Sequence, residues 1–225
     1  MGVLISTKNM NKNYKDIQAL KNINITIVPG TFNVIMGHSG SGKTTLLNIL
    51  GLLDEPSSGE IYIGDQPVSD FTNTQKAKLR METFGFVFQS FYLNPRMKAY
   101  ENVMVPMYIN EKYKGKDLKH MALELLSRFG LAERVNHFPY ELSGGEQQRV
   151  AIARALSNNP SCILADEPSG NLDEENEKIV MDYLKELTKQ GKSVVVVSHN
   201  PFVETYGDHR YYINKGILEE KTNGF

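Results

Sequence analysis

The sequence predicts an α/β fold into which a helical subdomain is inserted, and three observations support this prediction. Short apolar segments typical of strands recur in the first and last parts of the chain. A glycine-rich loop joins one of these segments to an apolar segment of helical character. Between residues 89 and 159 the strand signals fade, and apolar residues recur at helical spacing. Because the 225 residues contain no internal repeat, we expect one domain over residues 1–225.

The expected strands are short and mostly apolar. Ile23, Ile25 and Ile27 stand at every second position, as in a half-buried strand, and Pro29 and Gly30 then turn the chain. Helices are expected in most of the intervals between strands. The other expected strands cover residues 32–36, 61–63, 84–88, 161–166, 193–198 and 210–213.

One expected helix covers residues 43–53, directly after the glycine-rich loop, and the turn-forming residues 56–59 end it. The sequence also predicts a core of about residues 1–89 and 160–225, with the helical subdomain over about residues 90–159. Inside that subdomain, helices are expected over residues 99–109, 118–129 and 146–157.

Charge and cysteine content limit the classes of partner and compartment. The 25 Lys and Arg nearly balance the 26 Asp and Glu, so the composition indicates neither a nucleic-acid footprint nor a basic membrane-binding surface. The single cysteine, Cys162, cannot form an intrachain disulfide and suits a reducing cytosol. No apolar stretch approaches the roughly 18 to 20 residues that span a bilayer, and no secretory signal is visible. We therefore expect no nucleic-acid partner and no membrane crossing.

The glycine-rich loop fits the P-loop pattern completely, in the strand-to-helix context that phosphate binding requires. Its glycines let backbone N–H groups close around phosphate oxygens at a helix N-terminus. We expect Lys43 to reach the β- and γ-phosphates of ATP and the Thr44 hydroxyl to ligate Mg²⁺; a chance glycine-rich turn is the alternative. His38 is interpreted as a variable position rather than a catalytic residue. The ATP-binding residues expected here are Gly37, His38, Ser39, Gly40, Ser41, Gly42, Lys43, Thr44 and Thr45.

Two carboxylates, Asp166 and Glu167, follow the apolar run at residues 161–165. They are expected at the C-terminal end of a buried strand, which is where ligands bind in such sheets. Asp166 is expected to hold the Mg²⁺ shell, and Glu167 is a candidate to polarise the attacking water. Two acids after a strand usually form only a solvated loop, but the P-loop upstream favours the functional interpretation.

A second anion-binding helix start is expected at Ser143, Gly144 and Gly145, which precede a helical run. An ordinary loop is the alternative. The chain thus offers two phosphate-binding helix starts about 100 residues apart for one nucleotide. A head-to-tail dimer would use both, with Ser143 of one chain serving the γ-phosphate of ATP bound to the other.

The ordered motifs resemble those of the ABC ATPase family over nearly the whole chain. The resemblance implies a P-loop NTPase core with an N-terminal antiparallel β subdomain and an inserted α-helical signature subdomain, and it implies ATP hydrolysis with Mg²⁺. The motifs are the P-loop, Gln89, Leu142-Ser143-Gly144-Gly145-Glu146, Asp166-Glu167, Asn171-Leu172-Asp173 and His199.

The resemblance also implies roles for individual residues. Tyr14 would stack on adenine, although a buried or solvated tyrosine is the alternative. Gln89 would sense Mg²⁺ and the nucleophilic water, and Asp173 would cross the dimer interface. His199 would hydrogen-bond the γ-phosphate, so that it joins Glu167, Lys43 and Gln89 as a catalytic residue. An Asp commonly follows this histidine in relatives, whereas this chain has Asn200, which leaves carboxylate support for His199 in question.

Residues 48–54, 84–89 and 101–103 resemble the subgroup that powers macrolide export, lipoprotein release and antimicrobial-peptide export or resistance. This implies a homodimer on ATP binding, at the cytoplasmic face of the membrane, beneath an integral membrane permease of the MacB/FtsX-like type. The apolar region 89–107 is suited to bind a short helix of that partner, or else it forms the core of the helical subdomain. Export or extraction of peptide, lipoprotein or drug-like substrates is favoured, and the same chemistry would also serve mechanical signalling.

Two other classes of function are disfavoured. ABC ATPases that act on ribosomes usually carry two cassettes, and those that act on chromosomes carry long coiled coils, neither of which this sequence shows. A non-catalytic nucleotide-binding regulator predicts loss of Glu167, Lys43 or His199, and all three are present.

Overall fold

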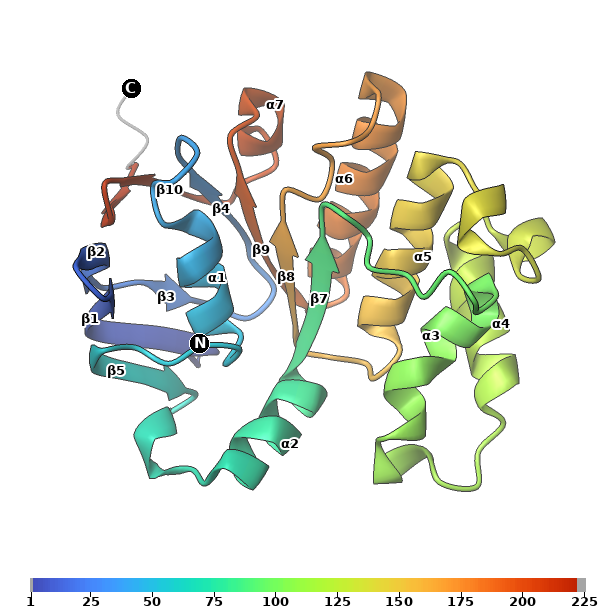
Figure 1. Ribbon diagram of the computed structural model, residues 1–225, viewed down its shortest axis with the longest axis horizontal. Helices are drawn as coiled ribbons and strands as arrows, with labels where there is room; N and C mark the ends of the chain where they lie inside the picture. Colours follow the sequence, from blue (N-terminus) through green and yellow to red (C-terminus); the bar gives the residue numbers. More distant parts are fainter. Residues whose placement is uncertain (1, 222–225) are drawn as a thin grey trace.

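The computed structural model describes residues 2–221, which form two sheets and the helices around them (Figure 1). The strands are β1 (Ile5–Tyr14), β2 (Ile17–Ile23), β3 (Thr26–Ile27), β4 (Phe32–Met36), β5 (Ser58–Ile63), β6 (Gln66–Pro67), β7 (Phe84–Phe88), β8 (Cys162–Asp166), β9 (Ser193–Ser198), β10 (His209–Asn214) and β11 (Ile217–Glu220). The α-helices are α1 (Lys43–Leu50), α2 (Asn73–Thr83), α3 (Ala99–Tyr108), α4 (Leu118–Arg128), α5 (Gly144–Leu156), α6 (Glu174–Lys189) and α7 (Pro201–Glu204).

The larger sheet has the strand order β11-β10-β4-β9-β8-β7, in which β11 is antiparallel to β10 and the other neighbours are parallel. Its central strands are mostly apolar because both faces are covered, as is usual for parallel sheets. In β9, Val194 and Val196 pack into one hydrophobic cluster, and Val195 and Val197 pack into the other. The sheet therefore separates two cores.

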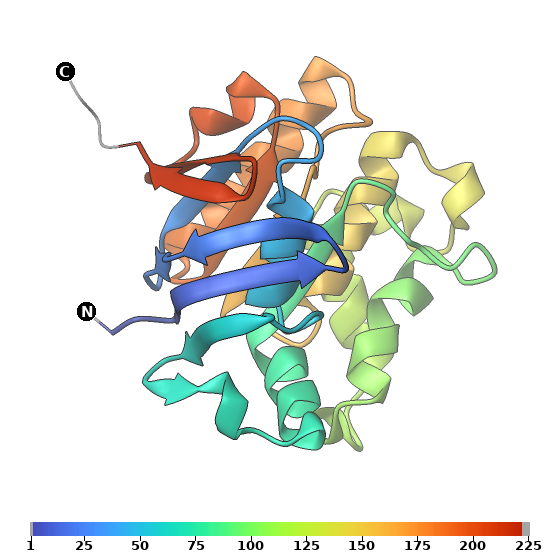
Figure 2. The same cartoon turned by 60° about the vertical axis from the view of Figure 1, so that its left-hand side comes forward.

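The smaller, N-terminal sheet is antiparallel, with the order β2-β1-β5-β6 and with β3 also paired to β1. Figure 2 shows its strands in front of α1. Apolar side chains of β1 and β2, such as Met10 and Leu20, share one buried cluster with Leu46 of α1 and Val195 of β9. Helix α1 is thus packed between the two sheets, which fixes the direction of its N-terminus.

The opposite face of the larger sheet is covered by helices. Residues of α5 and α6, such as Val150 and Leu184, share a buried cluster with Val196 of β9, and Val103 of α3 and Leu126 of α4 extend the same cluster away from the sheet. Helices α3, α4 and α5 lie between β7 and β8 in the chain and side by side in space (Figure 1). None of the helices within residues 2–221 is long and apolar enough to cross a membrane.

The α/β fold with an antiparallel N-terminal sheet is confirmed, and the expected strands over 32–36, 84–88 and 193–198 have the predicted bounds. Strand β1 was not expected, since its period-two pattern is broken by a register shift between Lys8 and Asn11. The single strand expected around Ile25 was wrong, because the chain leaves β2 at Ile23 and β3 begins only at Thr26.

Two helix ends also differ from expectation. The first helix ends at Leu50 rather than at residue 53, because Leu52 has φ 57° and cannot continue a right-handed helix. The helix expected to begin at residue 146 begins at Gly144, because Ser143 accepts a hydrogen bond from Glu146 N–H and thereby caps the turn.

Leu164 tests whether the sheet core determines stability. The side chain is fully buried in β8, so Leu164→Ala is expected to lower the free energy of unfolding by about 2 to 5 kcal/mol through lost burial and a residual cavity. Ile217, half exposed in β11, is the control, and Ile217→Ala is expected to cost about 0.5 kcal/mol or less. Urea unfolding followed by circular dichroism measures both, and equal losses would contradict this assignment of the core.

Candidate active site

The predicted catalytic residues follow the C-terminal ends of parallel strands. The P-loop follows β4, Gln89 follows β7, Asp166 ends β8 with Glu167 directly after it, and His199 follows β9. Because these strands are parallel neighbours, their ends meet at one edge of the sheet. They border a cleft with a cavity volume of about 760 Å³. Its lining includes the expected residues Tyr14, His38, Ser39, Gly40, Gly42, Lys43, Thr44, Thr45, Gln89, Asp166, Glu167 and His199.

The P-loop is held in a conformation that requires glycine. Gly42, the N-cap of α1, has φ 109°, which an L side chain rarely adopts. A Cβ at Gly37 would lie 2.5 Å from the carbonyl oxygen of Ile213. The turn between β10 and β11 closes on the same loop, since Gly216 N–H donates to the Ser41 carbonyl oxygen over 3.0 Å. Backbone packing rather than the loop sequence alone therefore sets its shape.

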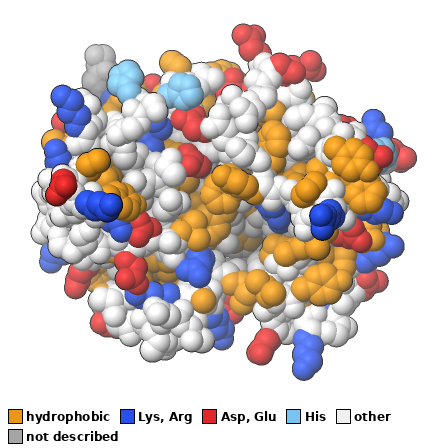
Figure 3. Space-filling model, viewed as in Figure 1, with side chains coloured by type: hydrophobic (Ala, Val, Ile, Leu, Met, Phe, Trp, Pro, Cys, Tyr) orange, Lys and Arg blue, Asp and Glu red, His pale blue; other side chains and the backbone are white. Residues whose placement is uncertain are grey.

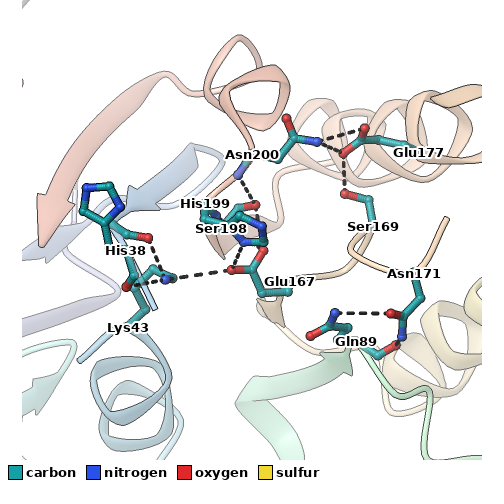
Figure 4. Close-up of polar contacts among 11 residues, drawn as sticks. His38, Lys43, Gln89, Glu167, Ser169, Asn171, Glu177, Ser198, His199 and Asn200 are labelled. Atoms are coloured by element: carbon teal, nitrogen blue, oxygen red, sulfur yellow. Dashed lines mark hydrogen bonds and ion pairs between the residues drawn. The ribbon is translucent and has the colours of Figure 1, made fainter. Parts of the chain in front are cut away.

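Lys43 and the buried Ser41 are the polar side chains that this loop directs inward. The Lys43 ammonium donates to the carbonyl oxygens of Gly37 (2.7 Å) and His38 (3.1 Å) and lies 3.9 Å from a carboxylate oxygen of Glu167 (Figure 4). Within residues 2–221, the buried Ser41 hydroxyl has no hydrogen-bond partner. A cationic Nζ beside glycine N–H groups at a helix start suits a polyphosphate.

Asp166 and Thr44 provide the oxygen ligands that fit Mg²⁺. Burial raises the pKa of Asp166, and the neighbouring Glu167 charge raises it further, against the lowering by a hydrogen bond from Thr44 and by Lys43. A half-buried carboxylate that accepts from a hydroxyl beside the P-loop is a suitable donor set for a hard divalent cation. Gln89 borders the same cleft, but its amide donates to Asn171 over 3.3 Å.

Glu167 is the most constrained residue of the cleft. It has φ 45°, a left-handed conformation that costs of order 1 to 3 kcal/mol for a non-glycine residue. Its N–H donates to the Val197 carbonyl oxygen (3.0 Å), which holds the turn in place. Its carboxylate accepts from the Ser198 hydroxyl (2.9 Å) and contacts Nδ1 of His199 at 2.8 Å (Figure 4). Carboxylate support for His199 therefore comes from Glu167.

Tyr14 lies at the rim of the cleft. Its hydroxyl donates to Asp54 over 2.6 Å, and Lys12 Nζ lies 4.8 Å from the centre of the ring. Burial and the hydrogen bond to Asp54 raise the pKa of Tyr14. The side chain is 45% exposed, so the fixed ring is accessible to a planar base.

The remaining predicted residues form a second cluster outside this cleft. Ser143 caps α5 and Asp173 caps α6, where it accepts from Asn176 N–H over 2.8 Å. Gly145 and Asn176 are in close contact, since a Cβ at Gly145 would lie 2.1 Å from Asn176 Oδ1. One chain thus brings Ser143, Gly145 and Asp173 together, with Gly144 beside them, but not to the P-loop.

Some cleft-lining residues were not predicted from the sequence. Ile17, Gln18, Ala19 and Lys21 come from β2, and Lys215 comes from the β10–β11 turn. These segments reach the cleft because the N-terminal sheet and the C-terminal hairpin fold over the P-loop. The only local sequence signal for these residues was a Lys-Gly turn between two short strands. Such a turn does not indicate a ligand-binding site.

A model of the ABC transporter family matches residues 20–170, more than half of the chain. The chain belongs to the ABC transporter family. It is an ATP-binding cassette and an ATPase.

Three relatives show how far the similarity of this cassette extends. It is 47% identical to MJ0796, an ABC transporter ATP-binding protein of Methanocaldococcus jannaschii, over 99% of each chain. It is 44% identical to LolD, the ATP-binding protein of a lipoprotein-releasing system of Francisella tularensis, over 96% of each. It is also 44% identical to the macrolide export ATP-binding/permease protein MacB of Syntrophobacter fumaroxidans, over 97% of this chain and 32% of that protein.

The structural similarity is equally extensive. MJ0796 has been solved as a dimer in a post-hydrolysis state bound to ADP and Pi. That structure matches the cassette with a TM-score of 0.89 at 44% identity, covering 98% of this chain and 100% of that one.

The ring of Tyr14 is expected to contribute to ATP affinity, and its hydroxyl is not. Loss of one base-stacking contact is worth about 1 to 3 kcal/mol, so Tyr14→Ala should raise the Kd for ATP about 5- to 150-fold. Tyr14→Phe keeps the ring, loses the bond to Asp54, and should change the Kd by about twofold or less. Titration with a fluorescent ATP analogue measures both, and an equal loss in the two variants would contradict stacking.

Proposed function

We propose that this cassette binds MgATP between two chains arranged head to tail and couples hydrolysis to movement of a separate membrane permease. The proposal rests on the observation that the predicted site residues form two separate clusters in one chain. The P-loop cleft lacks Ser143, Gly145 and Asp173, which lie together at the adjoining starts of α5 and α6. In a head-to-tail dimer, this second cluster of one chain completes the cleft of the other. The structure of MJ0796 as a dimer bound to ADP and Pi supports dimer formation.

Hydrolysis in this dimer is an in-line attack of water on the γ-phosphorus. Glu167 orients the water, and the bond to the β-phosphate oxygen breaks to release ADP. Thr44 and Asp166 would hold Mg²⁺, which would supply positive charge at the phosphates. Lys43 stabilises the transferring group from the P-loop side. Because an ionised carboxylate only accepts hydrogen bonds, Nδ1 of His199 donates to Glu167 and fixes its direction.

A larger cleft, with a cavity volume of about 1190 Å³, is the proposed docking site for the permease. It lies between β7 and the α2 side of the core on one side and α3 on the other, and Figure 3 shows hydrophobic side chains gathered around a hollow in this face. Leu53, Phe86, Tyr92 and Ile109 are among its apolar lining residues. Its size and apolar lining suit the apolar face of a short helix. Within residues 89–107, Tyr92 and Pro106 line this cleft, whereas Val103 and Met107 lie in the buried cluster.

Arg154 connects this docking cleft to the second cluster. Its guanidinium donates to the carbonyl oxygens of Phe91 and Tyr92, two residues with positive φ at the edge of the cleft. Arg154 is near the C-terminal end of α5, and Ser143 caps the other end. Movement of the cleft edge is therefore transmitted along a helix of about 20 Å to the residues that would face a second nucleotide.

The relatives support a role in export or extraction. LolD is named for lipoprotein release and MacB for macrolide export, and MacB is named as an ATP-binding and permease protein. By analogy, we propose a permease of the MacB/FtsX-like type for this cassette, which would then be peripheral at the cytoplasmic face of the membrane. Peptides, lipoproteins or drug-like molecules are the proposed substrate classes.

The first test is the oligomeric state of Glu167→Gln with ATP and Mg²⁺. Removing the carboxylate that orients water should slow hydrolysis about 10²- to 10⁴-fold and leave ATP bound, so the variant is expected to elute as a dimer. Size-exclusion chromatography with light scattering measures this, with the nucleotide-free protein as reference.

The control adds Ser143→Asp to Glu167→Gln. Aspartate caps α5 as well as serine does but repels a phosphate at the second cluster, so the double variant is expected to stay monomeric. A monomer at saturating ATP with Glu167→Gln alone would contradict an ATP-driven dimer of the isolated chain. A dimer that persists with Ser143→Asp would contradict the head-to-tail arrangement.

Docking at the larger cleft is tested by Ile109→Asp. A charge in the apolar cleft should lower ATPase stimulation by a reconstituted permease of the MacB/FtsX-like type about tenfold or more, while basal ATPase activity stays unchanged. Ile217→Asp, which adds the same charge on exposed β11, is the control. Stimulation that survives Ile109→Asp would place the permease contact elsewhere.

A further inference from the structure

A buried carboxylate, Glu177, lies behind the active site in the first turn of α6. It is 8% exposed and accepts three hydrogen bonds from two other segments. Ser169 donates its hydroxyl to Oε1 over 2.6 Å, and Nδ2 of Asn200 donates to Oε1 and Oε2 over 2.8 and 3.0 Å. Figure 4 shows Glu177 between these two side chains. None of these three residues lines the nucleotide cleft.

The two segments joined by Glu177 are those that carry Glu167 and His199. Ser169 is two residues after Glu167, and Asn200 directly follows His199. The segments also meet directly, because the Ser198 hydroxyl donates to Glu167 and accepts from Asn200 N–H over 3.1 Å. The hydrogen bonds therefore continue from Glu177 through Asn200 and Ser198 to Glu167. Glu177 therefore holds the two turns together away from the cleft, whereas Glu167 and His199, on the same two turns, line the cleft.

The Asn200 side chain must both accept and donate a hydrogen bond at this position. Its Oδ1 accepts from Phe202 N–H over 3.0 Å and caps α7, and its amide nitrogen donates to Glu177. Aspartate could cap the helix but could not donate, so its carboxylate would face that of Glu177 at hydrogen-bond distance. The asparagine after the histidine is thus matched to the glutamate on α6.

We propose that Glu177 is a positioning residue for ATP hydrolysis, acting through Ser169 and Asn200 to hold Glu167 and His199 in register. Its pairing with Asn200 accounts for an amide at a position where the family commonly has a carboxylate. The inference rests on the proposed roles of Glu167 and His199. Neither Glu177 nor Asn200 lines the nucleotide cleft. Breaking the pair therefore lowers kcat and leaves the Kd for ATP unchanged.

Exchange of the amide and the carboxylate tests the pair. Asn200→Asp is expected to lower kcat about tenfold or more, because a half-buried carboxylate then faces the buried carboxylate of Glu177. The double variant Glu177→Gln with Asn200→Asp restores one donor and one acceptor and should recover kcat to within about threefold of wild type. Glu175→Gln, on the exposed side of the same helical turn, is the charge control and should have wild-type activity. ATP hydrolysis at saturating MgATP, ATP affinity and thermal unfolding are measured for all variants.

Two outcomes would overturn the inference. Wild-type kcat in Asn200→Asp would mean that residue 200 only caps α7, since aspartate caps equally well. A double variant as slow as Asn200→Asp would mean that Glu177 is not its partner. If Asn200→Asp does not fold, Glu177→Ala decides: it removes the acceptor of three hydrogen bonds, and a wild-type kcat would overturn the positioning role.

The proposed roles of Glu167 and His199 are checked separately. Retained hydrolysis in Glu167→Gln would contradict the proposed function itself, whatever Asn200→Asp does. Lost hydrolysis in Glu167→Gln together with normal hydrolysis in Asn200→Asp would contradict only the positioning role of Glu177.

Discussion

Parallel pairing of β4, β9, β8 and β7 places the ends of four strands side by side, and the chemistry of the cassette depends on this alignment. Met36 pairs with Ser198, and Asp166 pairs with both Phe88 and Val197. The residues that follow these positions are the P-loop, His199, Glu167 and Gln89. A shift of one residue in any pair would turn each side chain to the opposite face of the sheet. The apolar faces of the strands, buried in two different cores, prevent such a shift.

The same alignment leaves the second cluster at a distance, on helices rather than on strands. Ser143 and Asp173 each accept from one N–H group at the start of α5 and α6, so both helix starts are formed within the single chain and keep other N–H groups for a ligand. Gly145 lets α5 approach Asn176 of α6 closely, which ties the two helix starts to each other. In the proposed head-to-tail dimer, each chain therefore brings two preformed clusters, and neither needs to refold when a second chain supplies the other.

The sequence was most informative where backbone conformation and chemistry coincide. The P-loop, Asp166 and Glu167 could be assigned because glycine spacing and strand-end acids follow directly from how phosphates are bound, whereas His199 was assigned only from the resemblance to the ABC ATPase family. The structure brings these residues into one cleft, whereas their catalytic roles stay predictions. The contribution of β2 and of Lys215 could not be predicted, because it arises when separate sheets close over the P-loop. Strand β1 was missed because a bulge near Asn9, which has φ 48°, breaks its alternation.

Support of the P-loop by the β10–β11 hairpin has a practical consequence for handling the protein. Gly216 donates to the Ser41 carbonyl oxygen, and a Cβ at the same glycine would lie 2.6 Å from the carbonyl oxygen of Ala19. The hairpin thus joins the loop to β2 from outside. An affinity tag or a fluorescent fusion placed after Lys221 leaves this brace intact. A truncation that removes Ile213 onward removes the contacts with Gly37 and Ser41, although every residue of the loop itself remains.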